Sequence, residues 1–279
     1  MWAGQVTRHS CGSSISSGPV IKARITSREV ARQSTIGACH RTCSPRRISA
    51  NMSTAALQPV SIAVGEQRGQ VSGLLLVPNR ARVCYVLAHG AGAGMAHPFL
   101  EAFAGERAMR EIATLRFQFP FMERGSKRPD APAMAQETVR AAVAEASRLL
   151  PGLPLVAGGR SFGGRMASEA QSASELANVR GLAFLGFPLH PPKRPSSLRA
   201  KHLFAVKIPM LFLQGTRDEL AELQHLRSVC DELGDLATLR LIEGADHGFR
   251  VRASSGRTEA EIRRELAEWF AEWLPSLSP

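Results

Sequence analysis

Apolar and polar positions along residues 59–274 follow two alternating patterns. Val83–Ala88 is an unbroken apolar run, which is typical of a strand buried on both faces of a sheet. Gln136–Leu150 instead repeats apolar residues every three or four positions, which is typical of a helix with one buried stripe. Strands that alternate with helices predict a mostly parallel sheet joined by right-handed crossovers.

The two patterns continue through the whole region. The expected strands are Pro59–Val64, Gln70–Val77, Val83–Ala88, Leu115–Phe119, Pro154–Ala157, Gly181–Leu185, Pro209–Leu213 and Thr238–Ile242. The expected helices are Phe99–Ile112, Gln136–Leu150, one that starts at Ser161 or Phe162, Glu219–Leu233 and Arg257–Trp273. Few residues separate the first two strands, so we expect a hairpin in which one strand is antiparallel to the rest. No repeat or linker divides 52–279, which predicts one α/β domain with about eight strands and helices on both faces.

Residues 1–51 differ from the rest of the chain in composition. They are rich in Ser and Arg, hold eight basic residues and one acid, and show no sustained hydrophobic period. Such a segment buries too little apolar surface to offset its ordering entropy, so we expect a disordered leader. It has the composition of an organelle transit peptide. Alternatively, the protein starts at Met52 and the leader is an artefact of the assigned start, which we favour because Met52-Ser-Thr-Ala-Ala-Leu is typical of an N-terminus.

Charge and cysteine content exclude several classes of function. The net charge of +11 is concentrated in the leader, since residues 52–279 hold 27 basic and 23 acidic residues. No stripe of interleaved basic and aromatic residues follows, so we expect no nucleic-acid partner. No apolar run approaches the roughly 18 residues of a membrane helix, so we expect no membrane partner. The spacing of Cys39, His40 and Cys43 is not that of a zinc site, and we expect no metal.

The cysteines also indicate the compartment. Three of the five lie in the leader, and only Cys84 and Cys230 follow it. An odd and sparse set does not form a disulfide framework, and it indicates a reducing environment. We expect a cytoplasmic protein, or a mitochondrial one if the leader is a real transit peptide.

The strongest chemical signal is Gly158-Gly159-Arg160-Ser161-Phe162-Gly163-Gly164, which contains the pattern G-x-S-x-G. An expected strand precedes it and an expected helix follows. A strand that turns abruptly into a helix strains its central residue, and side chains two positions before and after would collide with neighbours. The turn lifts the Ser161 hydroxyl above the sheet edge at the positive end of the helix. Ser161 is therefore the candidate nucleophile, and a bystander serine in a glycine-rich turn is the alternative.

A serine hydroxyl needs a base, and the base needs an orienting acid. His247 follows the last expected strand, and Asp218 follows the strand Pro209–Leu213. Open parallel sheets place their ligands beyond the carboxyl ends of strands, which is where all three residues fall. Asp246 is a rival acid, but it is poorly placed to orient its own neighbour. Glu219 is another rival, expected in the first turn of the next helix.

A glycine-rich loop, His89-Gly90-Ala91-Gly92-Ala93-Gly94, follows the strand Val83–Ala88. Acyl transfer builds negative charge on a carbonyl oxygen, and two backbone N–H groups must point at it. We expect these from Phe162 and Ala91, while Gly90 and Gly92 let a substrate approach the backbone. The glycine spacing here does not match that of a nucleotide-phosphate loop, so we expect no nucleotide cofactor. We also expect no other cofactor.

Three further observations concern the substrate. Phe121 follows a strand and could line an acyl pocket, and His190 follows another strand near the same edge. Arg160 and Arg165 flank Ser161, which makes an anionic substrate conceivable, although salt bridges or a solvated helix surface explain them more simply. Only about 20 residues separate the strands near 186 and 209, too few for a large cap domain, so we expect an open site.

Taken together, these residues resemble the α/β-hydrolase superfamily from about residue 59 to 274, with the triad order Ser161, Asp218, His247. Four segments resemble a narrower group: His89–Gly94, Arg116–Pro120, Gly158–Arg165 and Phe187–Pro192. That group includes dienelactone-hydrolase-like bacterial proteins, the testis-expressed protein 30 family and a subunit of the NSL histone-acetyltransferase complex. The resemblance implies the fold and the triad. Dienelactone hydrolases use a cysteine nucleophile, so Ser161 argues against that specific activity.

These observations predict a serine hydrolase that acts on small-molecule esters or thioesters with small acyl groups, without a cofactor. Ser161 attacks, His247 moves the proton and Asp218 fixes the imidazole tautomer. A different class of protein stays open as the alternative, because the same fold also serves as a non-catalytic interaction module.

Overall fold

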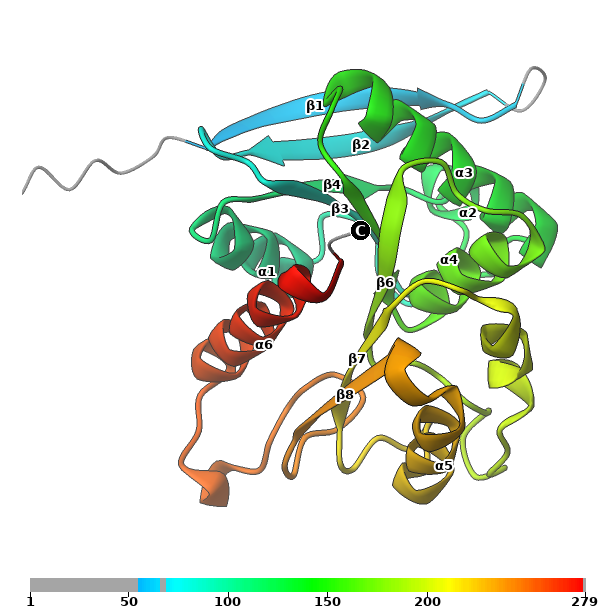
Figure 1. Ribbon diagram of the computed structural model, residues 1–279, viewed down its shortest axis with the longest axis vertical. Helices are drawn as coiled ribbons and strands as arrows, with labels where there is room; N and C mark the ends of the chain where they lie inside the picture. Colours follow the sequence, from blue (N-terminus) through cyan, green and yellow to red (C-terminus); the bar gives the residue numbers. More distant parts are fainter. Residues whose placement is uncertain (1–54, 66–68, 278–279) are drawn as a thin grey trace, which may run out of the picture. The chain divides into compact units, whose positions relative to one another are not determined.

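The computed structural model describes residues 55–65 and 69–277, and the leader predicted for 1–51 lies outside them. Eight strands form one sheet in the order β1-β2-β4-β3-β5-β6-β7-β8 (Figure 1). The strands are β1 (Ala56–Ala63), β2 (Gln70–Val77), β3 (Val83–Ala88), β4 (Ile112–Phe117), β5 (Leu155–Arg160), β6 (Val179–Leu185), β7 (Met210–Gly215) and β8 (Ala237–Ile242). All eight predicted strands are therefore present.

The strand directions agree with the sequence pattern. β1 and β2 form an antiparallel hairpin in which Ala56 pairs with Val77 and Ala63 with Gln70. β2 is also antiparallel to β4, and every other neighbouring pair is parallel. The prediction of one antiparallel strand in a mostly parallel sheet is confirmed, and that strand is β2.

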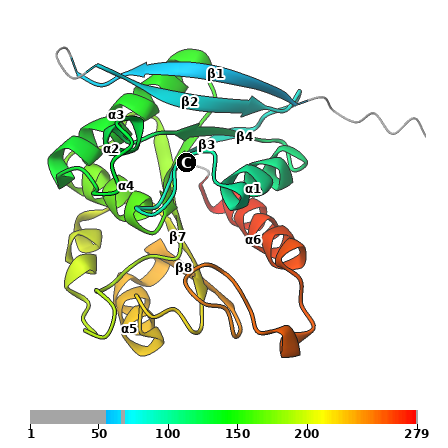
Figure 2. The ribbon, with the colours of Figure 1, turned by 180° about the vertical axis from the view of Figure 1, so that it is seen from behind.

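Helices cover both faces of the sheet (Figures 1 and 2). They are α1 (Pro98–Ala108), α2 (Pro120–Glu123), α3 (Pro132–Leu149), α4 (Phe162–Ala173), α5 (Leu223–Leu233) and α6 (Glu259–Trp273). α1 and α6 bury their apolar residues in the core on one face, and α3, α4 and α5 bury theirs on the other. Successive side chains of a strand point to opposite faces, so Val86 of β3 faces one core and Tyr85 the other.

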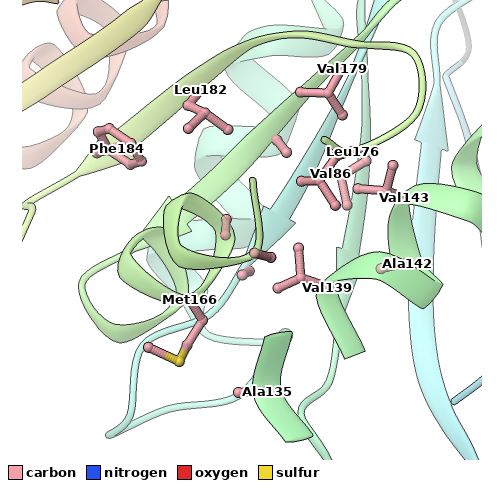
Figure 3. Packing of buried hydrophobic residues seen from close by; sticks show 14 of the residues in the cluster. Val86, Ala135, Val139, Ala142, Val143, Met166, Leu176, Val179, Leu182 and Phe184 are labelled. Carbon is pink, nitrogen blue, oxygen red and sulfur yellow. The ribbon is translucent and has the colours of Figure 1, made fainter. Parts of the chain in front are cut away.

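The core beneath α3 and α4 shows why this sequence specifies these layers. α3 places Val139, Ala142 and Val143 toward the sheet, and Met166 of α4 lies beside them (Figure 3). The spacing of three and four residues puts these side chains on one helix face. Each large side chain buried in such a core contributes several kcal/mol to the free energy of unfolding, because truncating a core Phe to Ala costs about 3–5 kcal/mol.

Several helix boundaries differ from the prediction. α3 starts at Pro132, four residues before the predicted Gln136, and α6 starts at Glu259, two residues after the predicted Arg257. α1 ends at Ala108, not at Ile112, and Glu111 adopts a φ of 60° before β4 begins at Ile112. The apolar residues that continued the helical pattern belong to the start of that buried strand. α5 starts at Leu223, not at Glu219, because the preceding residues form a turn in which the Leu220 N–H donates to the Asp218 carboxylate.

The sequence pattern did not predict α2 or the 3-10 segment Leu198–Ala205. This 3-10 segment connects β6 to β7 without a cap domain. No helix in the described part of the chain is both long and apolar enough to span a membrane.

Candidate active site

Ser161 stands at the sharp turn between β5 and α4, with φ 51° and ψ −116°. This conformation is strained for a residue with a side chain, and it lifts the residue out of the strand. A Cβ atom on Gly159, at φ 155°, would lie 2.3 Å from the Ala88 carbonyl oxygen, and one on Gly163 would lie 2.5 Å from that of His89. Only glycine fits at either position, which is the steric reason for the G-x-S-x-G spacing.

The structure brings Ser161, His247 and Asp218 into one hydrogen-bonded chain. His247 Nε2 lies 2.8 Å from Ser161 Oγ, and His247 Nδ1 lies 2.7 Å from Asp218 Oδ2. Because a carboxylate only accepts hydrogen bonds, Nδ1 carries the imidazole proton and Nε2 is free to accept from the hydroxyl. The Asp218 side chain is fully buried, and that of His247 is 25% exposed.

Gln214 also takes part in this series of hydrogen bonds, and sequence reasoning missed it. It is the next-to-last residue of β7 and is fully buried, and its Nε2 donates to Asp218 Oδ2 at 2.5 Å. Its Oε1 accepts from the Phe187 N–H at 2.8 Å, which fixes the orientation of the amide. The Leu220 N–H donates to Asp218 Oδ1 at 2.8 Å. Three donors therefore fix the orientation of the Asp218 side chain. A polar residue directly after the apolar run of a buried strand is the signal that could have identified Gln214.

The rival acids lie elsewhere. Asp246 Oδ1 accepts from the backbone N–H groups of Gly248 and Arg250, so this carboxylate shapes the loop that carries His247. Glu219 lines a separate pocket on the far side of Asp218. Neither carboxylate is hydrogen-bonded to the imidazole, which agrees with the argument that adjacent Asp246 is badly placed.

A cavity of about 340 Å³ opens at the Ser161 hydroxyl. Its walls are Gly90, Ala91, Gly92, Ala93, His97, Leu100, Arg160, Ser161, Leu220 and His247. Gly90, Ala91 and Gly92 thus lie in the same cavity wall as Ser161, and their roles toward a substrate stay a prediction. Among the described residues, none accepts a hydrogen bond from the backbone N–H of Ala91 or Phe162. Phe162 is the first residue of α4, where a helix leaves its N–H groups without internal partners.

His89 supports the glycine-rich loop from below. Its Nε2 accepts from the Phe119 N–H at 3.0 Å, so Nδ1 carries the proton and donates to the Gly90 carbonyl at 2.7 Å. Burial lowers the pKa of this imidazole, which the hydrogen bond to the Gly90 carbonyl opposes. A neutral imidazole with a fixed tautomer therefore ties the start of the loop to the chain that follows β4.

The structure does not bring Phe121 or His190 to the cavity at Ser161. Phe121 is fully buried beneath the loop, with its ring centroid 5.7 Å from that of His89. An aromatic ring gains more from this packing than from a place in an open cavity wall. His190 is also buried, and its Nε2 accepts from the Glu222 N–H at 3.0 Å, so it stabilises the turn before α5.

The described residues contain no group of three or more His, Cys, Asp or Glu side chains arranged to hold a metal ion. Cys84 and Cys230 are free and buried, and burial raises the pKa of each thiol to about 12. Thiols with such pKa values stay protonated near neutral pH and are poor nucleophiles. Ser161 is thus the nucleophile candidate that the cavity exposes.

Comparison with known proteins places the chain in a family. The family model of the alpha/beta hydrolase domain matches residues 81–275 of this sequence, and the chain belongs to this family. A dienelactone hydrolase from Anabaena variabilis is 20% identical, with a TM-score of 0.63 over 80% of this chain and 98% of that one. An α/β serine hydrolase without lid from Xanthomonas campestris is 20% identical, with a TM-score of 0.61 over 80% and 97%.

Est1E from Butyrivibrio proteoclasticus is more distant, at 14% identity and a TM-score of 0.58 over 78% of this chain and 98% of that one. At these identities the likeness is one of fold, and the eight-stranded α/β-hydrolase fold predicted from the sequence is confirmed. The likeness to a dienelactone hydrolase agrees with the broader resemblance. The narrower resemblance, to testis-expressed protein 30 and the NSL-complex subunit, stays a prediction.

Proposed function

We propose that this protein is a serine hydrolase that cleaves esters or thioesters with small acyl groups through an acyl-enzyme. The observation that carries the proposal is the continuous chain from Ser161 Oγ through His247 to Asp218, with contacts of 2.8 Å and 2.7 Å. A nucleophile hydrogen-bonded to a base, and a base oriented by a third group, is the arrangement that activates a serine. Ser161, at one end of these hydrogen bonds, lines an open cavity, so a substrate can reach its hydroxyl.

In the first half of the reaction, His247 Nε2 takes the hydroxyl proton while Ser161 Oγ attacks the carbonyl carbon. Asp218 stabilises the imidazolium that forms, and His247 then gives the proton to the leaving alcohol or thiol. In the second half His247 activates water in the same way, and the acid is released. Gln214 and Leu220 hold the buried Asp218 side chain in position throughout.

The backbone N–H groups of Phe162 and Ala91 supply the oxyanion site in this proposal. Both lack an acceptor among the described residues, and Ala91 lines the cavity. Removing a single donor from such a site costs an enzyme about 10² to 10³ in kcat. His89 acts through the loop, because its bond to the Gly90 carbonyl orients the peptide groups that follow.

The cavity volume and chemistry favour small acyl groups. A space of about 340 Å³ is at the lower end for small-molecule sites, and its walls are mostly Gly, Ala and Leu. We propose no dienelactone hydrolase activity, because that family's cysteine is replaced here by Ser161.

Labelling with a fluorophosphonate tests the proposal directly. We expect the full chain to be labelled and Ser161→Ala not to be, with a parallel loss of p-nitrophenyl acetate and butyrate hydrolysis. Ser168→Ala is the matched control, because Ser168 Oγ also lies 2.7 Å from a histidine nitrogen, that of His202, but is fully buried on α4. This variant should be labelled like the wild type. Equal labelling of wild type and Ser161→Ala would instead support the non-catalytic interaction module.

A further inference from the structure

Arg160 places a cation in the wall of the proposed catalytic cavity. The residue immediately precedes Ser161 and lines the cavity together with His97. Its guanidinium carbon lies 5.1 Å from the centre of the Phe99 ring. Phe99 is in turn stacked on Phe249 of the His247 loop, with centroids 5.8 Å apart and planes 5° from parallel. The Phe99 ring thus packs against the guanidinium, and a guanidinium that stacks on a ring can still donate hydrogen bonds from its edge.

This cation has no carboxylate partner within ion-pair distance among the residues that the structure describes. The acid whose charge acts on it, Asp246, uses Oδ1 to hold the backbone of its own loop. Burial lowers the pKa of Arg160, and the positive charge of Arg250 lowers it further. A partly buried cation beside a second cation costs free energy that an anion in the cavity would recover.

His97 reports the same positive potential. It lines the cavity, and its pKa is lowered by partial burial first and then by the charges of Arg160 and Arg250. Arg165, on the other side of Ser161, differs in each respect. Its Nε lies 3.4 Å from Glu169 Oε1, so its charge is paired along α4, and it does not line the cavity.

We propose that the cavity binds substrates that carry an anionic group, a carboxylate or a phosphate, and that Arg160 contacts this group directly. The charge of Arg250 adds to the positive potential at Arg160 and His97. This inference rests on the proposed hydrolase function and names its substrate class: short-chain esters or thioesters with a negative charge a few bonds from the scissile carbonyl. The fork of an arginine matches either anion with two parallel hydrogen bonds.

Matched p-nitrophenyl esters test this assignment. The hexanoate, the adipate with a free terminal carboxylate, the methyl ester of that adipate and a terminal phosphonate of the same length differ only at the chain end. We expect kcat/KM for the carboxylate or the phosphonate to exceed that of the neutral methyl ester by about ten- to a hundredfold, mainly through KM. Whichever of the carboxylate and the phosphonate has the higher kcat/KM identifies the anionic group that the site prefers. Raising the ionic strength should reduce the preference.

Variants separate Arg160 from general effects of charge. Arg160→Gln should lower the ratio of anionic to neutral kcat/KM by about ten- to a hundredfold, and Arg160→Lys should restore part of it. Arg165→Gln is the control and should leave the ratio unchanged, because that arginine is paired. An unchanged ratio in Arg160→Gln, or an equal fall in Arg165→Gln, would overturn the inference.

A direct binding measurement keeps this inference separate from the proposed function. Calorimetric titration of adipate and of inorganic phosphate into the full chain requires no hydrolysis. We expect one of these anions to bind the wild type and Arg165→Gln at least tenfold more tightly than Arg160→Gln. Binding of this kind without ester hydrolysis would refute the hydrolase alone. Hydrolysis of neutral esters without any anion binding that depends on Arg160 would refute the anion site alone.

Discussion

The carboxylate of Asp218 faces only hydrogen-bond donors, so replacing it with an amide is a sharp perturbation. Oδ2 accepts from His247 Nδ1 and Gln214 Nε2, and Oδ1 accepts from the Leu220 N–H. The Asp218→Asn amide offers one acceptor oxygen and one NH₂ group, so at least one donor must face that NH₂ group. Gln214 cannot turn over to help, because the Phe187 N–H holds its Oε1.

Both orientations of the new amide are harmful. If its NH₂ faces His247, Nδ1 must accept, the proton moves to Nε2, and the imidazole can no longer take the Ser161 proton. If its oxygen faces His247, the tautomer survives but the charge that stabilises the imidazolium is lost. A wrong tautomer costs such enzymes about 10⁴-fold in kcat, which corresponds to about 5.5 kcal/mol of transition-state stabilisation. We expect kcat/KM of Asp218→Asn to fall by about 10³ to 10⁴.

Steady-state hydrolysis of p-nitrophenyl butyrate measures this loss, and thermal unfolding shows whether the variant is folded. One unpaired buried donor should lower the free energy of unfolding by about 1–3 kcal/mol. Asp246→Asn is the control, because the asparagine Oδ1 can still accept from Gly248 and Arg250, and we expect a change within about threefold. The reasoning is refuted if folded Asp218→Asn keeps a tenth of wild-type activity, or if Asp246→Asn loses as much.

Three further substitutions test the surroundings of the site. Gly159→Ala should prevent correct folding, seen as loss of soluble protein, because its Cβ would lie 2.3 Å from a backbone oxygen; a normally folded variant would contradict the elbow geometry. Gln214→Leu should lower kcat about tenfold or more with little change in KM, since Asp218 loses one of its three donors, and a change confined to KM would contradict this. His202→Gln should flatten the decline in stability between pH 6.5 and 4, because burial holds the pKa of His202 at about 4.

The sign of the His202 effect follows from proton uptake. Its ordinary pKa is 6.5, so between pH 6.5 and about 4 the unfolded chain binds a proton that the folded protein does not. The wild type therefore loses stability as the pH falls through this range. Because His202 is partly exposed, we expect about 1–2 kcal/mol. Urea unfolding of both proteins at pH 7 and pH 4.5 checks it, and parallel pH dependences would contradict the assignment.

Arg107 shows what local patterning cannot predict. The pattern placed it on a helix, as a residue that ordinarily lies in solvent, whereas the structure buries it fully. Its guanidinium carbon lies 4.0 Å from the centre of the Phe103 ring and 4.5 Å from that of Tyr85, and it donates to Thr114. Stacking on rings from α1 and β3 replaces hydration, and those partners meet only in the folded chain.

The strands, their alternation with helices and the turn at Ser161 could be predicted from the amino-acid sequence, because they depend on side-chain periodicity and on sterics within a few residues. The sequence also placed Asp218 and His247 beyond the ends of strands, because chain order and strand position are local properties. Which side chains contact one another could be seen only in the folded protein. Folding brings Gln214 within hydrogen-bond distance of Asp218 and buries His190 and Phe121 away from the cavity. It also pairs Arg165 with a carboxylate, whereas Arg160 lies in the cavity wall. Hydrogen bonds and charges act over a few ångströms in space, and sequence separation carries no record of those distances.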